Sequence, residues 1–129
     1  MKIDHVAVWT GDLERLKNFY CKYFGAEPGE KYINPAKKFE SYFLSFESGA
    51  RLELMQMPGI PANQMDILKQ YTGIIHIAIS VGSCEEVIRL TDLLCSDGYP
   101  VLSRPRKTGD GYFESCVTDP DGNRLEITA

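Results

Sequence analysis

The sequence predicts an α+β fold built from two tandem βαβββ modules. Each half begins with a β-branched strand, continues with a helix that stops at a glycine, and ends with three strand-like segments. Distinctive residues recur at nearly constant offsets: His76 follows His5 by 71 positions, and Glu126 follows Glu53 by 73. Because duplicated modules usually pack by symmetry, equivalent residues of the two halves are expected to come together in one domain, 1–129.

Module one is expected to span residues 1–57. A strand over 3–9 is followed by Asp12, a preferred N-cap residue, so we expect a helix from Leu13 to about Phe24. Gly25 then ends the helix, since glycine readily takes the left-handed conformation found after a helix. The apolar positions that give this helix one buried face are Leu13, Leu16, Phe19, Tyr20, Tyr23 and Phe24. After a break at Pro28 and Gly29, strands are expected near 30–34, 38–47 and 51–57.

Module two, residues 73–129, repeats this order and starts with a strand over 74–81. Ser83 and Glu86 have the spacing of a capping box, which predicts a helix from there to about Ser96. Its inward residues are expected to be Val87, Leu90, Leu93 and Leu94. Strands are then expected near 99–104, 111–118 and 123–128, with the last turn at Asp119-Pro120-Asp121-Gly122.

The four recurring residues fall on one face of the predicted sheet. Side chains alternate between the two faces of a strand, and the aliphatic set around Ile77 must lie under the helix, so His76 points away from it. The same alternation turns Glu126, Glu53 and His5 away from the helices. Two imidazoles and two carboxylates converging on one point would bind a divalent metal such as Zn, Ni, Co, Fe or Mn. Any one of them alone is more often a plain core or surface residue, but the duplication and the shared face favour a metal site.

Composition is that of a soluble globular protein and argues against several partners. The chain has 129 residues, of which 25% are charged, and a net charge of −4. It has no basic patch for nucleic acid and no apolar run long enough for a membrane. No signal-peptide core follows Met1, so we expect a cytoplasmic protein. The cysteines form no C-x-x-C pair and are expected to be buried or half-buried free thiols: Cys21, Cys84, Cys95 and Cys116.

Three motifs connect the chain to a known family. They are Asp4-His5-Val6-Ala7 at the start, Asn18-Phe19-Tyr20 through Phe24-Gly25 in the first helix, and Asp119-Pro120-Asp121-Gly122-Asn123-Arg124-Leu125-Glu126 at the end. With these motifs the whole chain resembles the vicinal oxygen chelate superfamily of glyoxalase I, bleomycin-resistance proteins, methylmalonyl-CoA epimerase and extradiol dioxygenases. The resemblance implies that the paired modules curl their sheets into a cleft that holds a metal. The family's ligand set maps onto His5, Glu53, His76 and Glu126.

The nearest branch is glyoxalase I, or lactoylglutathione lyase. It implies a metal-dependent lyase or isomerase that acts through a metal-stabilised enolate on a small oxygenated substrate, with Glu126 as the base and Glu53 as the other candidate. Bacterial glyoxalases carry an arginine and an asparagine for glutathione at the positions that are Trp9 and Met57 here, which puts a glutathione substrate in doubt. Trp9, Met57 and Met55 suggest a more apolar pocket, or equally a packed core.

Other functions remain open alongside this one. The first is a bleomycin-resistance-type protein that binds a ligand without catalysis. The second, ranked lowest, is an extradiol dioxygenase, because a fourth protein ligand would crowd its Fe(II). Candidate substrate contacts, each of which could instead be solvated surface, are Trp9, Arg51, Met55, Arg104, Lys107, Tyr112 and Arg124, three of them in or beside a loop expected over 104–111.

The stretch 58–72 is expected to link the modules, with a weakly helical part at Met65–Tyr71. Its apolar residues suggest that it packs on something, either a partner subunit or its own chain's sheet edge. Because open sheet edges expose unpaired backbone groups, we expect a homodimer, with the metal site formed within one chain or between two.

Overall fold

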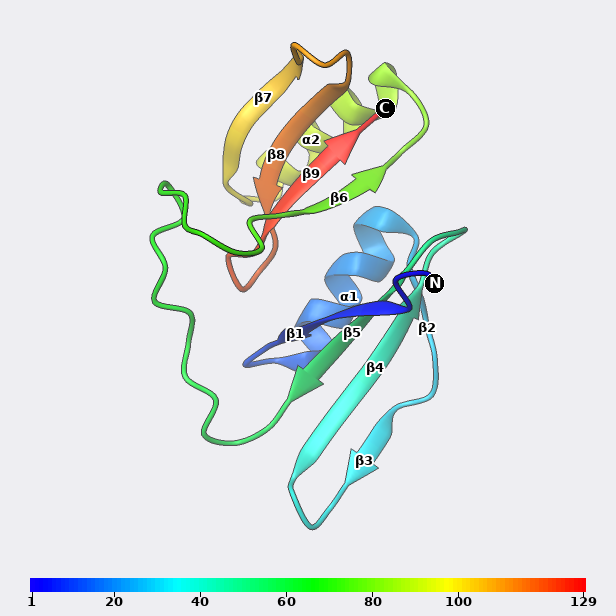
Figure 1. Cartoon of the computed structure of the whole chain (residues 1–129), viewed down its shortest axis with the longest axis vertical. Coiled ribbons are helices and arrows are strands. Elements are labelled where there is room, and N and C mark those ends of the chain that lie inside the picture. Colours follow the sequence, from blue (N-terminus) through cyan, green and yellow to red (C-terminus); the bar gives the residue numbers. More distant parts are fainter. The chain divides into compact units, whose positions relative to one another are not determined.

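The computed structural model describes all residues, 1–129, and divides them into two compact units, 1–63 and 64–129 (Figure 1). Each unit holds one mixed sheet with one helix against a single face, as the repeated pattern predicts. The fold class is therefore confirmed as α+β, with one βαβββ-like module in each unit. No helix is long and apolar enough to cross a membrane.

Unit one forms a five-stranded sheet in the order β1-β5-β4-β2, with β3 also pairing with β4. Strands β1 and β5 run parallel and the other pairs are antiparallel. Its elements in order are β1 (His5–Trp9), α1 (Leu13–Phe24), β2 (Glu27–Pro28), β3 (Tyr32–Asn34), β4 (Phe39–Ser45) and β5 (Arg51–Gln56).

The second strand of module one differs from the prediction, because it is split into β2 and β3. Pro28, expected to break the chain, is the end of β2 and pairs with Leu44. Proline is tolerated there because β2 is an edge strand, where a missing N–H leaves no inner ladder bond unmade. Gly29 continues the pairing through its N–H to the Phe43 carbonyl at 2.9 Å.

Helix α1 begins and ends where its capping residues predict. The Asp12 side chain accepts a hydrogen bond from the Arg15 N–H at 3.0 Å, and Gly25 follows the helix with φ +63°. The buried residues are Leu13, Leu16, Phe19, Tyr20 and Tyr23, whereas Phe24 is half-buried. They meet the buried face of the sheet at Leu44, Leu52 and Leu54. Each such side chain contributes roughly 1.5–3 kcal/mol by leaving water.

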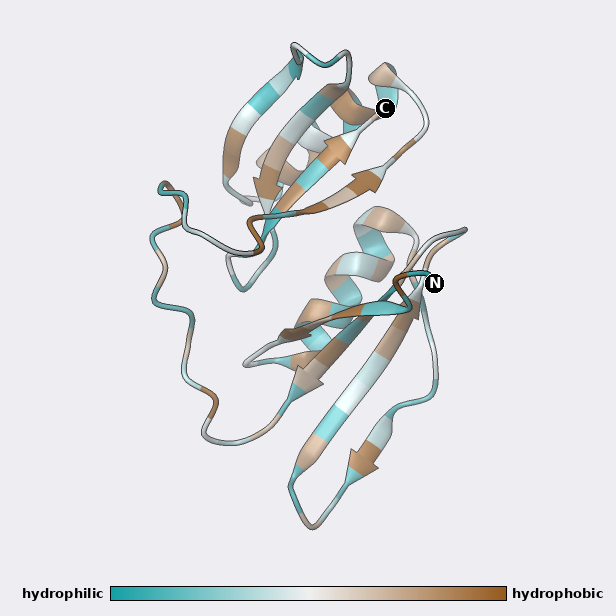
Figure 2. Cartoon of the chain, viewed as in Figure 1, coloured by the Kyte–Doolittle hydropathy of each residue, from teal (hydrophilic) through white to brown (hydrophobic).

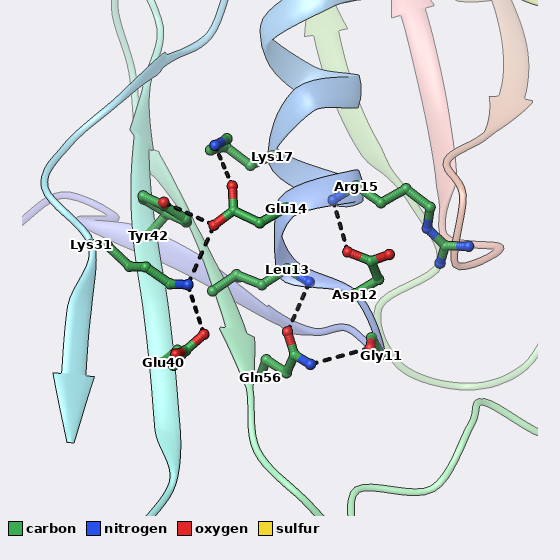
Figure 3. A network of polar contacts seen from close by, with 10 residues as sticks. All are labelled: Gly11, Asp12, Leu13, Glu14, Arg15, Lys17, Lys31, Glu40, Tyr42 and Gln56. Atoms are coloured by element: carbon green, nitrogen blue, oxygen red, sulfur yellow. Dashed lines mark hydrogen bonds and ion pairs between the residues drawn. The ribbon is translucent and has the colours of Figure 1, made fainter. Parts of the chain in front are cut away.

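Polar contacts also hold α1 to the sheet (Figure 3). The Gln56 side chain accepts from the Leu13 N–H at 2.9 Å and donates to the Gly11 carbonyl at 3.2 Å. In the same first turn, Glu14 accepts hydrogen bonds from Lys17, Tyr42 and Lys31, which lower its pKa to about 2.

Unit two forms a four-stranded sheet in the order β6-β9-β8-β7, with β6 and β9 parallel. Its elements are β6 (Ile77–Ser80), α2 (Cys84–Ser96), β7 (Val101–Lys107), β8 (Phe113–Thr118) and β9 (Arg124–Thr128). The Ser83 side chain caps α2 by accepting from the Glu86 N–H at 3.2 Å, as its spacing predicts.

The buried face of α2 differs from the prediction at one position. Leu93 was expected inside but is 36% exposed, and Thr91 is buried in its place. Successive residues turn by about 100°, so Thr91 lies about 40° from Val87 and about 60° from Leu94, whereas Leu93 lies about 120° from Val87 and about 100° from Leu94. The Thr91 hydroxyl is paired with the Ser115 hydroxyl at 2.6 Å and with the Val87 carbonyl at 2.6 Å.

Three further predictions of local structure are wrong. The strand expected over 74–81 spans only Ile77–Ser80, since its ladder with β9 runs from Ile77–Leu125 to Ser80–Thr128. The loop expected over 104–111 is shorter, since β7 continues to Lys107 with register shifts between Val101 and Arg106 that accommodate an edge-strand proline. The stretch Met65–Tyr71 is not helical.

That stretch instead makes an isolated turn. The Asp66 side chain accepts from the Leu68 N–H at 2.9 Å, and the Asp66 carbonyl accepts from the Lys69 N–H at 3.0 Å. A side-chain acceptor of this kind competes with helix formation by offering the backbone another partner.

The cysteines are free thiols, and three of them are partly buried as expected. Cys84 is exposed instead, because it occupies the first position of α2 and lies outside the helix's buried stripe. Burial raises the pKa of the Cys116 thiol.

Candidate metal centre

Module one brings His5 and Glu53 together on the sheet face away from α1. In the parallel register of β1 and β5, Ala7 lies opposite Glu53, one same-face position along from His5. The His5 Nε2 and Glu53 Oε2 atoms are 3.7 Å apart. The neighbouring Leu52 and Leu54 are buried under α1, so the predicted alternation of faces is confirmed in this strand.

His5 is held by a network that leaves its Nε2 facing the carboxylate. Its Nδ1 lies 3.0 Å from Asp4 Oδ2, and Arg51 Nη2 donates to the same oxygen at 2.6 Å. The His5 hydrogen bond and then the Arg51 guanidinium lower the pKa of Asp4. Phe43, opposite Glu53 in the β4–β5 ladder, contacts the imidazole edge-on at 5.2 Å. A carboxylate on Nδ1 is the arrangement that orients many metal-binding histidines through Nε2.

Module two repeats the pair. The His76 Nε2 and Glu126 Oε2 atoms are 3.2 Å apart, and the side chains are 36% and 23% exposed. Glu126 lies on β9 between Ala78 of β6 and Cys116 of β8. His76 immediately precedes β6 rather than lying within it. Leu125 and Ile127 are fully buried on the opposite face, and Figure 2 shows this alternation as brown and teal bands along β9.

Within each module, one imidazole nitrogen and one carboxylate therefore lie close enough together to bind the same cation. No group of three or more His, Cys, Asp or Glu side chains in 1–129 is placed to hold a metal ion. A pair offers only two of the four ligands that a tetrahedral transition metal takes, so either pair alone is half of a ligand set. The nitrogen and oxygen donors suit borderline divalent metals.

The predicted substrate contacts lie in several places. Arg124, on the same face as Glu126, donates from Nη2 to the carbonyls of Ile67 and Lys69 at 2.5 and 2.9 Å. Arg104 turns to α2, where it pairs with Asp92 at 3.2 Å. Lys107 and Tyr112 are exposed at and beyond the end of β7. Arg51 is held by Asp4.

The apolar positions of module one separate into two places. Trp9 and Met55 are direct partners in the β1–β5 ladder, beside the His5–Glu53 pair. Met57 lies beyond β5 and lines a hollow of about 440 Å³, together with Thr10, Gly11, Lys38, Glu40, Gln56, Pro58 and Ile60.

Sequence reasoning missed several residues around the two pairs. Asp4 was not predicted as a site residue, although a carboxylate next to a candidate ligand is a usable signal for an orienting partner. Phe43, Phe39 and Cys116 could be found only once the strand register was known, because they come from strands that are distant in sequence.

Comparison with known proteins identifies the family. Residues 2–127 match the glyoxalase/bleomycin resistance protein/dioxygenase superfamily, and the chain belongs to it. The lactoylglutathione lyase of Arabidopsis thaliana is 31% identical over 95% of the chain, and that of Haemophilus influenzae is 30% identical over 98%. The chain spans 42% of the length of the plant relative and 91% of the bacterial one. Glyoxalase I from Zea mays superposes with a TM-score of 0.79 at 27% identity, covering 98% of this chain and 44% of that one.

Proposed function

We propose that the protein is a metal-dependent lyase or isomerase of the glyoxalase type, acting on a small oxygenated substrate. The observation that carries the proposal is the duplicated His–Glu pair on the helix-free face of each module. His5, Glu53, His76 and Glu126 would together hold one divalent ion, within one chain or between two. Relatives named lactoylglutathione lyase support a lyase of this superfamily.

The proposed chemistry divides between the metal and the protein. A bound divalent cation would stabilise negative charge on the substrate's oxygen atoms. Glu126 would take the proton from the hydroxyl-bearing carbon beside the carbonyl and return it to the former carbonyl carbon, while the hydroxyl proton passes to the former carbonyl oxygen; Glu53 is the alternative base. Asp4 keeps the His5 ring oriented so that its Nε2 remains available.

Metal content of the purified protein tests the site. After equilibration with Zn, Ni, Co or Mn, we expect about one bound ion for each set of His5, Glu53, His76 and Glu126. Removing that ion with a chelator should lower the melting temperature of the protein. Binding to the folded state alone stabilises by about 4 kcal/mol at a thousandfold excess over Kd. His76→Ala, His5→Ala and Glu126→Gln should each weaken binding, whereas Glu86→Gln in the first turn of α2 should not. Absence of metal uptake would refute the site and favour a ligand-binding protein without catalysis.

Glutathione is not the proposed co-substrate. Trp9 and Met57 stand where the bacterial enzymes carry polar contacts, so activity on the hemithioacetal of methylglyoxal and glutathione should be weak or absent in the metal-loaded protein. Turnover like that of an ordinary metal-dependent glyoxalase would contradict this part of the proposal.

We also propose a homodimer. Within their own sheets, β1 and β6 each pair on one side only, which leaves a row of backbone groups at each edge. The linking stretch exposes apolar side chains as well, including Met65 and Leu68. Light scattering at micromolar concentration tests the assembly, and a monomer with full metal occupancy would rule out both a dimer and an intersubunit site.

A further inference from the structure

The helix-free face of module one changes character along β5. Arg51, Glu53 and Met55 follow one another on this face, so it runs from charged through the candidate ligand to apolar. The spacing of same-face residues places Met55 about 7 Å from Glu53. Trp9 lies directly across from Met55 in the β1–β5 ladder.

Three aromatic rings extend the apolar end. Trp9 contacts Phe39 edge-on with ring centroids 6.0 Å apart, and Phe39 contacts Tyr32 at 6.1 Å. They come from β1, β4 and β3, so the row Trp9–Phe39–Tyr32 crosses the sheet. We call these residues the aromatic row.

The aromatic row is not part of the core of unit one. The core lies on the other face, where α1 covers Leu44, Leu52 and Leu54. Trp9 is 39% exposed and Tyr32 is 56% exposed, so both rings keep accessible surface. Exposed aromatic rings beside candidate catalytic groups offer stacking and edge contacts to a flat apolar group.

We propose that the aromatic row, with Met55, binds a flat apolar substituent of the substrate while the substrate's two vicinal oxygens lie at Glu53. The substrate is then a compound that carries an aryl group and a hydroxyl or oxo oxygen on carbon 2, next to the oxygen on carbon 1. This inference rests on the proposed function, because Glu53 marks the reacting end only if it is a metal ligand. The order of residues along β5 also gives the direction in which the substrate lies: oxygens toward Glu53 and ring toward Trp9.

Two chelating acids that differ only in their substituent test this inference. Lactate and mandelate carry the same 2-hydroxycarboxylate, but mandelate has a phenyl group in place of the methyl. With the metal-loaded protein, mandelate should bind about tenfold more tightly, as expected for one aromatic contact plus burial of ring surface. Trp9 is the chain's single tryptophan, so its emission should change with mandelate and remain constant with lactate.

Variants separate the aromatic row from a general effect on folding. Phe39→Leu removes the middle ring and keeps the fluorescent reporter, so it should reduce mandelate affinity severalfold without changing lactate affinity. Phe24→Leu is the matched control, since Phe24 is a half-buried ring of the same module on α1. If Phe39→Leu does not fold, Trp9→Leu measured by calorimetry serves in its place.

The outcomes distinguish the two proposals. Metal uptake with equal affinity for lactate and mandelate would overturn the aromatic site and leave the proposed function standing. A mandelate preference that survives both Phe39→Leu and Trp9→Leu would also overturn it. A chain that takes up no metal would overturn the proposed function, and this inference with it.

Discussion

Replacing Gln56 should weaken module one by an amount that its contacts define. One carboxamide joins the first helical N–H, that of Leu13, to the carbonyl of Gly11 (Figure 3). Leu13 is 1% exposed, so water has poor access to its freed N–H in a Gln56→Ala variant. Two hydrogen bonds at roughly 1 kcal/mol each predict a loss of about 2 kcal/mol in the free energy of unfolding.

Gln56→Glu is the matched control for this prediction. A carboxylate can still accept from the Leu13 N–H but cannot donate to the Gly11 carbonyl, so about half of the loss should remain. Urea unfolding followed by Trp9 emission reports on module one, because the only tryptophan lies in β1. A loss below about 0.5 kcal/mol in the free energy of unfolding for Gln56→Ala would show that water replaces both hydrogen bonds and that the Gln56 side chain does not stabilise the contact between α1 and β5.

Three other predictions concern both modules. The Glu14 carboxylate has a pKa of about 2, below its ordinary pKa of 4.5, so it should stabilise the fold above pH 4.5 and lose that effect as the pH falls toward 2. Glu14→Gln should therefore match the stability of the parent protein in acid and have a free energy of unfolding lower by about 0.5 kcal/mol at pH 7, after allowance for solvent screening. Arg124→Gln should speed tryptic cleavage after Lys69 by about tenfold, since the guanidinium no longer binds the Lys69 carbonyl. An unchanged rate of cleavage, measured by mass spectrometry, would contradict this prediction. Thr91→Val should cost about 1–2 kcal/mol by leaving the buried Ser115 hydroxyl without this partner, and adding Ser115→Ala should recover part of that loss in thermal unfolding.

Features that depend on neighbouring residues could be predicted from the sequence. Asp12 and Gly25 delimit α1 because capping involves backbone groups only three to five residues away. The face on which Glu53 and Glu126 lie follows from strand alternation alone, which needs only the direction of the buried aliphatic residues. The repeated offset between the histidines identified the candidate ligands before any contact was known.

Features that depend on pairing between distant segments were decided by the tertiary structure. Pro28 was misjudged because its tolerance depends on being at a sheet edge, which is a property of β4's neighbours and not of residue 28. The hydrogen-bond partners of Arg124 and Arg104 likewise depend on segments that are distant in sequence. A guanidinium on a flexible chain takes whatever acceptors folding brings near, so Arg124 binds the linker's carbonyls and Arg104 binds Asp92 of α2.

The sequence by itself determined which residue types occur twice and which side of each strand they occupy. Only the tertiary structure determined that Arg51 holds Asp4, and that rings from three strands make one row beside Glu53. The physical reason is range. Periodicity and capping depend on residues within one or two turns of chain, whereas strand register depends on the simultaneous burial of side chains from segments far apart in sequence. Strand register places residues such as Phe43 opposite Glu53.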